Sequence, residues 1–182
     1  TETLPNDLGA QWGQFFSGTP IDSDTRDALY LACMNPVART EIQQDNWFAT
    51  FDEIELGFQM LPIVLGLRVA GFSEKIGRGD TIQLPTLRPD DPELAAAAMN
   101  VLMTAGTLKI NDEKEIQATT VGRRVFSRGP GPFGIIEAYH GYMRQLPQIL
   151  VHGRGKAWVQ RSANIAASQD ANRKTFDTAN NS

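Results

Sequence analysis

A chain of 182 residues suits one domain with an additional arm or linker. Hydrophobic residues make up 41% and charged residues 21%, which excludes a fully disordered chain. The longest apolar stretch, Met60 to Phe72, is interrupted by Pro62 and Arg68, so no membrane-spanning helix is expected. The lone Cys33 and only two histidines exclude a disulfide framework and a zinc cluster, and no export signal is visible. These features predict a reduced, cytoplasmic protein.

The net charge of −4 conceals an uneven distribution. Residues 1–120 hold 8 Lys and Arg against 18 Asp and Glu, whereas residues 121–182 hold 9 against 3. A basic third of this kind indicates either a nucleic-acid face or docking on the acidic body or on an anionic partner domain. Domains that bind nucleic acid are usually basic overall, so we favour docking.

The first third of the chain predicts short helices. Apolar residues recur at helical spacing over 8–16, and Gly18 and Pro20 end that segment. A second helix is expected to begin after Asp22 and to contain the apolar run 28–34, with Asp22 and Asp24 as its cap and first-turn charges. The same two carboxylates also suit a hard metal ion, an interpretation that we rank below capping.

The next stretch, 51–76, is mainly apolar and helical. Pro62 is expected to end or kink a helix there. A charged loop punctuated by glycines is expected over 74–80. Six residues of the stretch are expected to face a core: Ile63, Val64, Leu67, Val69, Ala70 and Phe72.

The clearest helix begins at Asp91 and stops at Gly106. Alternating residues over 107–110 and 115–119 then predict a β-hairpin, and Thr119 or Thr120 caps a short helix. This order of helix, hairpin and short helix is that of a winged-helix unit. The long helix presents one apolar stripe: Leu94, Ala98, Val101, Leu102 and Ala105.

In a winged-helix protein that reads DNA, the helix before the wing enters the major groove. Here that helix starts with Glu93 and continues with alanines, and no Lys or Arg occurs between Arg88 and Lys109. The wing tip, Asp112 and Glu113, is acidic as well. Because acidic groups repel phosphate and alanine reads no base edge beyond methyl contact, we expect no DNA binding by this element.

The last third contains the most chemically suggestive residues. A match to G-x-G-x-x-G over 129–134 contains two prolines without an N–H, so it predicts a rigid turn and not a cofactor loop. A long helix is expected over 133–150, in which His140 stands between Tyr139 and Tyr142. This histidine is either a general base or orienting group for a substrate hydroxyl, or a partly buried side chain satisfied by a hydrogen bond.

The segment 158–176 is rich in Asn, Gln, Ser and Arg, whereas a solvated helix usually carries Glu and Lys. Its amides and guanidinium groups indicate either specific polar contacts or an exposed face.

Three sequence segments together carry a family resemblance: 65–72 (LGLRVAGF), 101–108 (VLMTAGTL) and, after the hairpin, 119–123 (TTVGR). On these, the stretch Gln59 to Arg128 resembles the N-terminal winged-helix and dimerisation domain of class I S-adenosylmethionine-dependent methyltransferases of the small-molecule, natural-product type. The similarity extends more loosely over Phe133 to Phe176.

The resemblance implies a mainly α fold in three parts. A helical arm would span 1–50, a winged-helix-like dimerisation domain 51–130, and a long helix and linker 131–182 would lead to an absent catalytic domain. No strand followed by a G-x-G-x-G loop occurs in the chain, so S-adenosylmethionine would be held only in a full-length enzyme. The chain would then be the front portion of that enzyme, and not competent for methyl transfer alone.

The resemblance also implies partners and a site. The expected partners are a second copy of the chain, joined by helix exchange, a small-molecule substrate and the missing catalytic domain; neither a membrane nor nucleic acid is expected. His140 is the candidate catalytic base. The candidates for facing the substrate follow from position and chemistry: Tyr139, Tyr142, Arg144, Trp158, Arg161, Asn164, Gln169, Asn172 and Arg173.

Two other classes of function remain open. The first is a winged-helix transcriptional regulator, which has the same fold argument but the wrong charge on its reading helix. The second is a free-standing module that binds a small anionic ligand through the basic C-terminal segment.

Overall fold

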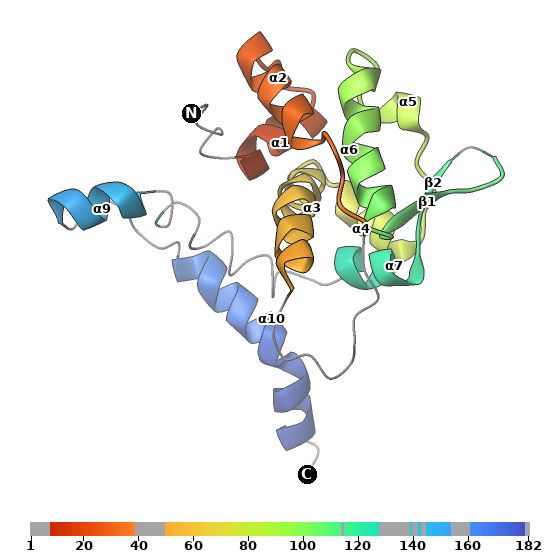
Figure 1. The fold of residues 1–182 in the computed structure, drawn as a ribbon. Coiled ribbons are helices and arrows are strands. Elements are labelled where there is room, and N and C mark those ends of the chain that lie inside the picture. The colour runs from red at the N-terminus through yellow and green to blue at the C-terminus, as the bar shows by residue number, and fades with distance from the viewer. Residues whose placement is uncertain are drawn as a thin grey trace. The chain divides into compact units, whose positions relative to one another are not determined.

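The computed structural model describes residues 8–38, 50–113, 115–127, 139, 142, 145–153 and 161–180. Within these residues the chain is mainly α-helical with one antiparallel β-hairpin, as the sequence predicts (Figure 1). The chain folds as two compact units, residues 1–127 and residues 128–182.

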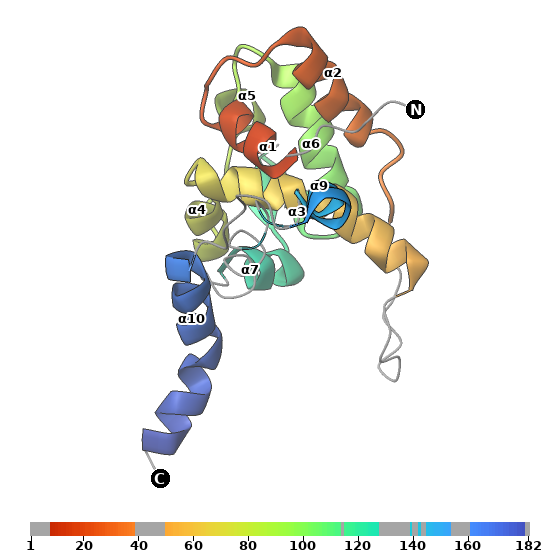
Figure 2. The same ribbon diagram turned by 90° about the vertical axis from the view of Figure 1, so that its left-hand side faces the viewer.

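The first helix, α1 (Leu8–Phe16), packs against α3 (Phe51–Val69) (Figure 2). Where the helices meet, Gly66 of α3 lies against the backbone of Trp12, and a Cβ atom at Gly66 would lie only 2.4 Å from the Cβ of Trp12. The predicted apolar face of residues 8–16 is confirmed. Three of its aromatic side chains are buried, with ring centroids 5.1–5.6 Å apart: Trp12, Phe15 and Phe16.

The second helix, α2 (Ser23–Ala32), begins with the predicted cap. The backbone N–H of Thr25 donates a hydrogen bond of 2.7 Å to the Asp22 carboxylate. This hydrogen bond lowers the pKa of Asp22, and Asp24 adds a second negative charge in the first turn. Capping, and not metal binding, is therefore the structural role of Asp22.

The stretch 51–76 differs from the prediction in two respects. Pro62 does not end α3, which continues to Val69; the break comes at Gly71, whose φ of 77° only glycine adopts readily, and α4 (Phe72–Arg78) then leaves at 102°. The predicted loop over 74–80 is instead mostly this helix. Gly77 does not disrupt it but lets α7 approach, because a Cβ atom at Gly77 would lie 2.9 Å from the Ser127 nitrogen.

The predicted core face of α3 is correct at Ile63, Val64 and Leu67, all of which are buried. Val69 was expected beside them but is 63% exposed. At about 100° per residue, Val69 lies about 200° around the helix from Leu67, on the side that meets α1, where a Cβ atom at Gly13 would lie 3.2 Å from the Val69 Cγ1 atom. Val69 therefore lies at the edge of the contact with α1 and not among the buried residues of α3. Ala70 and Phe72, beyond the end of α3, are half-buried.

A winged-helix order follows in the chain. Ile82 forms a bridge to Ile116, so a single residue extends the two-stranded hairpin on its inner edge. Strand β2 therefore pairs with β1 on one side and with Ile82 on the other. The elements in chain order are α4, Ile82, α5 (Leu84–Leu87), α6 (Pro92–Thr104), β1 (Leu108–Ile110) and β2 (Ile116–Ala118).

The long helix α6 is the centre of this unit. Its predicted cap is confirmed, since the Asp91 carboxylate accepts a hydrogen bond of 3.2 Å from the Leu94 N–H. Its predicted apolar stripe is buried at all five positions, Leu94, Ala98, Val101, Leu102 and Ala105.

The short helix α7 (Thr120–Ser127) closes the unit. Thr119 is its cap: the Gly122 N–H donates to the Thr119 hydroxyl, and that hydroxyl in turn donates to the Gly106 carbonyl at 2.7 Å. A Cβ atom at Gly122 would lie 1.8 Å from the Thr107 carbonyl oxygen. The start of α7 is thus held directly against the turn between α6 and β1.

In the second unit, the predicted helix over 133–150 lies largely outside the described residues. Tyr139 and Tyr142 are helical, but a separate helix, α9 (Leu146–His152), begins after Gln145. Pro147 in its first turn explains the new start, because proline has no N–H to continue a preceding helix. The polar segment that follows forms α10 (Arg161–Asn180), whose alanines favour a helix despite the weak apolar spacing.

Among the described residues, no single helix has the length and apolar character to cross a membrane. The pair α3 and α4 meets those criteria only when its members are taken together across their 102° bend.

The glycine contact between α1 and α3 can be tested within one helix. We expect Gly66→Ala to lower the free energy of unfolding by about 1–3 kcal/mol, because the new methyl group must displace the backbone of Trp12. Gly57→Ala is the matched control, since nothing lies within 4 Å of a Cβ atom there; we expect it to stabilise by about 0.5–1 kcal/mol through helix propensity. Urea unfolding measures both, and equal effects would contradict the close contact.

Candidate functional site

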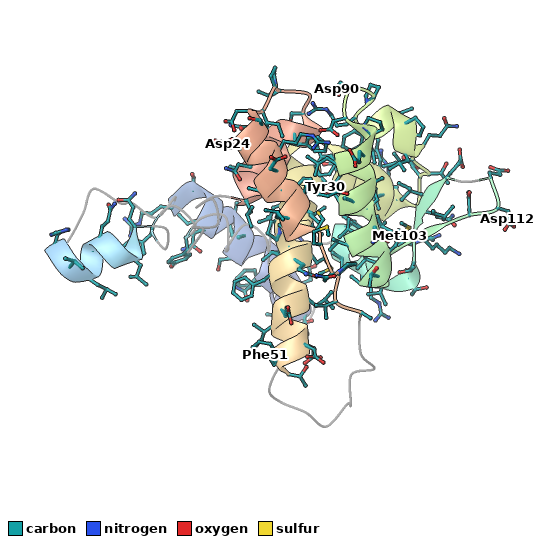
Figure 3. All side chains as sticks on the ribbon, turned by 45° about the horizontal axis from the view of Figure 1, so that its top comes forward. Asp24, Tyr30, Phe51, Asp90, Met103 and Asp112 are labelled. Atoms are coloured by element: carbon teal, nitrogen blue, oxygen red, sulfur yellow. The ribbon has the colours of Figure 1, made fainter. Side chains whose placement is uncertain are left out.

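The helix that would read DNA in a winged-helix regulator, α6, leaves only one side open to solvent. Along α6 only Pro92, Glu93 and Asn100 are exposed. Its remaining positions are buried or half-buried; Met103, which Figure 3 labels near the wing, is half-buried. The exposed or half-buried positions 93, 96, 97, 100, 103 and 104 do share one side of the helix, but that side carries no Lys or Arg and its only charge is Glu93. It therefore lacks the cations with which a recognition helix contacts phosphates and guanine edges.

The first turn of α6 binds α2 through ionic hydrogen bonds. Arg26 donates from Nε to Asp91 at 2.6 Å and from Nη2 to the other Asp91 oxygen at 3.1 Å, and also reaches Glu93 at 3.2 Å. The Asp91 side chain is only 16% exposed. The hydrogen bond from Arg26 lowers the pKa of Asp91, and the same bond raises the pKa of Arg26.

A second arginine binds the loop before α6 to α1. Arg88 is buried, with its guanidinium 4.4 Å from the centroid of the Phe15 ring. It donates hydrogen bonds to the Phe15 carbonyl and to the Asp90 carboxylate, and the latter lowers the pKa of Asp90. Asp90 lies at the top of the loop in Figure 3. The two cations nearest to the would-be reading helix are therefore both engaged in holding the fold.

The residues that the structure describes at the tip of the wing include two exposed carboxylates. Asp112, at the end of the hairpin in Figure 3, and Glu113 are both exposed. Asn111 shapes the turn, since its side-chain oxygen accepts hydrogen bonds from the N–H groups of Glu113 and Glu115. Hydrogen bonds from the side chains of Thr81 and Asn111 lower the pKa of Glu115, so the turn remains anionic at neutral pH.

The structure brings two of the predicted substrate-facing residues together. Tyr139 and Asn164 lie 25 positions apart in the sequence, and the Asn164 amide donates a hydrogen bond of 3.4 Å to the Tyr139 hydroxyl. Tyr139 is 40% exposed and Asn164 is half-buried, so both remain accessible to a small molecule.

Of the other candidates, Tyr142 is half-buried, and four lie exposed on α10: Arg161, Gln169, Asn172 and Arg173. Three candidates lie outside the described residues: His140, Arg144 and Trp158.

Helix α10 has two different sides. Ala167 is fully buried and lies on the same side as half-buried Asn164, one turn away. The opposite side presents amides between two large apolar residues, Ile165 at 57% and Phe176 at 56% exposure. Positions 165, 169, 172 and 176 follow the spacing of a single helical face. A helix surface of this composition is suited to contact another protein surface.

A second exposed apolar surface lies on the first half of α3. No residue between Phe51 and Met60 is buried. Phe51 is 78% exposed, Ile54 48% and Phe58 75%, and the spacing places them on one side of the helix. We call these three residues the α3 stripe; Phe51 marks its free end in Figure 3.

The structure also contains an open hollow between the wing and α7 that the sequence analysis did not single out. It has a volume of about 620 Å³. In the sequence, its three cations stand before and after the second strand, Lys109 on one side and Arg123 and Arg124 on the other. Only the packing of α7 beside the hairpin brings them to one place. We call it the basic hollow, lined by Lys109, Gln117, Ala118, Thr119, Thr120, Arg123, Arg124 and Ser127.

A scan against protein-family models finds no match, and searches of curated proteins and of solved structures find no similar protein. The functional interpretation therefore depends on the residues and on the resemblance described above.

The ionic contact at the head of α6 can be measured by a double-mutant cycle of Arg26→Gln and Asp91→Asn, since asparagine still caps the helix. We expect a coupling free energy of about 1 kcal/mol at pH 7. Because the folded protein lowers the pKa of Asp91, this coupling is present above the ordinary aspartate pKa of about 3.9 and lost as the pH falls further.

The matched control is the surface pair Arg78 and Asp80, 3.6 Å apart with side chains 64% and 53% exposed. Its coupling should stay below about 0.5 kcal/mol. Equal couplings at the two pairs at pH 7 would contradict the assignment.

The contact between Tyr139 and Asn164 can be tested by NMR. Tyr139→Phe removes the acceptor oxygen, so the side-chain amide resonances of Asn164 should shift, while the free energy of unfolding should change by less than about 0.5 kcal/mol. Tyr142→Phe serves as the control and should leave those resonances in place. Unchanged Asn164 resonances in Tyr139→Phe would show that the two side chains do not meet in solution.

Proposed function

We propose that this chain is the N-terminal dimerisation and substrate-lid portion of an S-adenosylmethionine-dependent methyltransferase that acts on a small molecule. The proposal starts from the resemblance of Gln59 to Arg128 to that family. The observation that supports it best is the buried, acid-headed α6 inside a winged-helix order of elements. Such an element serves as a structural scaffold and is unsuited to reading DNA.

The regulator alternative conflicts with three features of the first unit. The open side of its reading helix carries no cation, Arg26 and Arg88 near the head of that helix are bound to carboxylates, and Asp112 and Glu113 at the wing tip are acidic. A DNA-binding protein needs free cations that replace the counterions of the phosphates. The scaffold interpretation requires none of these cations to be free.

A second copy of the chain is the proposed partner of the α3 stripe. Three large apolar side chains that project from one side of a helix destabilise a solitary protein in water and suit an isologous helix pair.

The methyl donor is assigned to residues beyond this chain. Within the described residues the strands belong to the hairpin, and neither is followed by a glycine-rich loop with free N–H groups. The described part therefore does not fit S-adenosylmethionine as that family binds it. S-adenosylmethionine belongs, in this proposal, to a catalytic domain that follows α10.

The role of the second unit is to contact the methyl acceptor. Tyr139 and Asn164 form the one described pair of candidates, and α10 offers further amides and guanidinium groups for polar recognition. His140 is assigned as the base that accepts a proton from the acceptor. With a single, buried cysteine, we place the protein in the reducing cytoplasm.

Dimer formation tests the first half of the proposal. Sedimentation of the chain at micromolar concentration should give the mass of a dimer, and Phe58→Glu should raise the dissociation constant at least about tenfold by burying a charge in the interface. Ile110→Glu, at an apolar position of similar exposure on the wing, is the matched control. A monomeric wild-type chain would contradict the dimer.

The reading frame after Ser182 tests the second half. A following β-strand with a glycine-rich loop and an acidic residue is expected, and the longer protein should bind radiolabelled S-adenosylmethionine while the 182-residue chain does not. A stop codon directly after Ser182 would count against the methyltransferase, whatever the outcome of the dimer measurement.

A further inference from the structure

The basic hollow combines one face of the hairpin with one side of α7. Lys109 of β1 and Gln117 of β2 are paired in register, and they alternate with residues such as the buried Leu108. Because side chains alternate along a strand, Lys109 and Gln117 point away from the core. Arg123 and Arg124 on α7 are both exposed and line the same hollow.

The hollow gathers positive charge. Its lining contains three cations and no carboxylate. Across the described part of the chain, none of the three takes part in an ion pair. This contrasts with Arg26 and Arg88 of the same unit, which both bind carboxylates. Like charges gathered around a concave surface favour an anion there.

Close backbone contacts fix the start of α7, the helix that carries Arg123 and Arg124. The Thr119 N–H donates to the Thr107 carbonyl at 3.0 Å, and the Thr119 hydroxyl donates to the Gly106 carbonyl. The Gly122 contact with Thr107 leaves no room for the helix to shift. A binding group on a preorganised helix loses less entropy on binding than one on a mobile loop, so the arrangement suits a ligand site.

The remaining lining groups also suit a phosphate. The hydroxyls of Thr120 and Ser127 and the amide of Gln117 are neutral hydrogen-bond donors. A volume of about 620 Å³ lies within the range of small-molecule sites. We propose that the basic hollow binds a small molecule that carries a phosphate or diphosphate group.

A polymer fits the surroundings less well than a small anion. A nucleic-acid strand that followed the hairpin beyond Lys109 would meet the exposed carboxylates of Asp112 and Glu113. A ligand confined to the hollow avoids them. The site is separate from the residues assigned to the methyl acceptor, so this proposal stands or falls independently of the proposed methyltransferase.

Inorganic pyrophosphate is the probe for a test on the complete 182-residue chain. Titration followed by ¹H–¹⁵N NMR at about 0.15 M salt should give saturable binding with a dissociation constant below about 1 mM. The shifted amides should be those of the hairpin and α7. Absence of saturation at about 10 mM pyrophosphate, or shifts centred elsewhere, would overturn the proposal.

Variants separate a built site from general attraction to a cation. Arg123→Gln and Arg124→Gln should each weaken binding at least about fivefold, while Arg124→Lys should retain most of it because the charge remains. Lys75→Gln changes the net charge equally at an exposed position outside the hollow and should have no effect. Equal weakening by Lys75→Gln would overturn the proposal.

A short DNA duplex, titrated under the same conditions, distinguishes the source of the phosphate. It should bind more weakly than pyrophosphate. If the duplex bound at least about tenfold more tightly than pyrophosphate, and Arg123→Gln weakened both to the same extent, the ligand of the hollow would be nucleic acid and not a small molecule.

Discussion

The fold of residues 1–127 depends on how the acidic head of α6 is held. The helix buries its whole apolar stripe at the centre of the unit, while Asp90, Asp91 and Glu93 gather at its start. Arg26 from α2 and Arg88 from the preceding loop neutralise these carboxylates and at the same time bind α1 and α2 to the winged-helix elements. The ion pairs of Arg26 and Arg88 therefore neutralise the carboxylates at the start of α6 and also hold α1 and α2 against that end of the helix.

This arrangement also limits what the protein can do. Helices α2 and α3 pack against α6, and the side that α6 leaves open carries no cation with which a winged helix would bind DNA. The surfaces that remain available are of other kinds: the apolar α3 stripe, the basic hollow beside α7, and, in the second unit, the amide-rich side of α10. Each suits a different class of partner, namely a like helix, a small anion and a polar protein or substrate surface.

Much of the fold was accessible to local reasoning. Caps at Asp22 and Asp91, the α6 stripe and the hairpin all follow from short-range patterns, and the structure confirms them. Local reasoning was wrong in expecting a loop over 74–80, because contact with α7 orders α4 there. Of the two outcomes expected at Pro62, a helix end does not occur, because packing against α1 carries α3 past the missing hydrogen bond. Of the candidate substrate-facing residues, the described structure joins Tyr139 and Asn164 by a hydrogen bond. The sequence could not predict this pairing, because a contact between residues 25 positions apart leaves no periodic pattern.

By itself the sequence determined the helical class, the position of the wing and the absence of positive charge along the helix before it, because capping, periodicity and charge are properties of neighbouring residues. Tertiary structure alone decided where the surplus cations act. Arg26 and Arg88 became internal ties, whereas Lys109, Arg123 and Arg124 were gathered around one hollow. The reason is that an ion pair or an anion site depends on distances of a few ångströms between segments far apart in the chain, and only packing sets those distances.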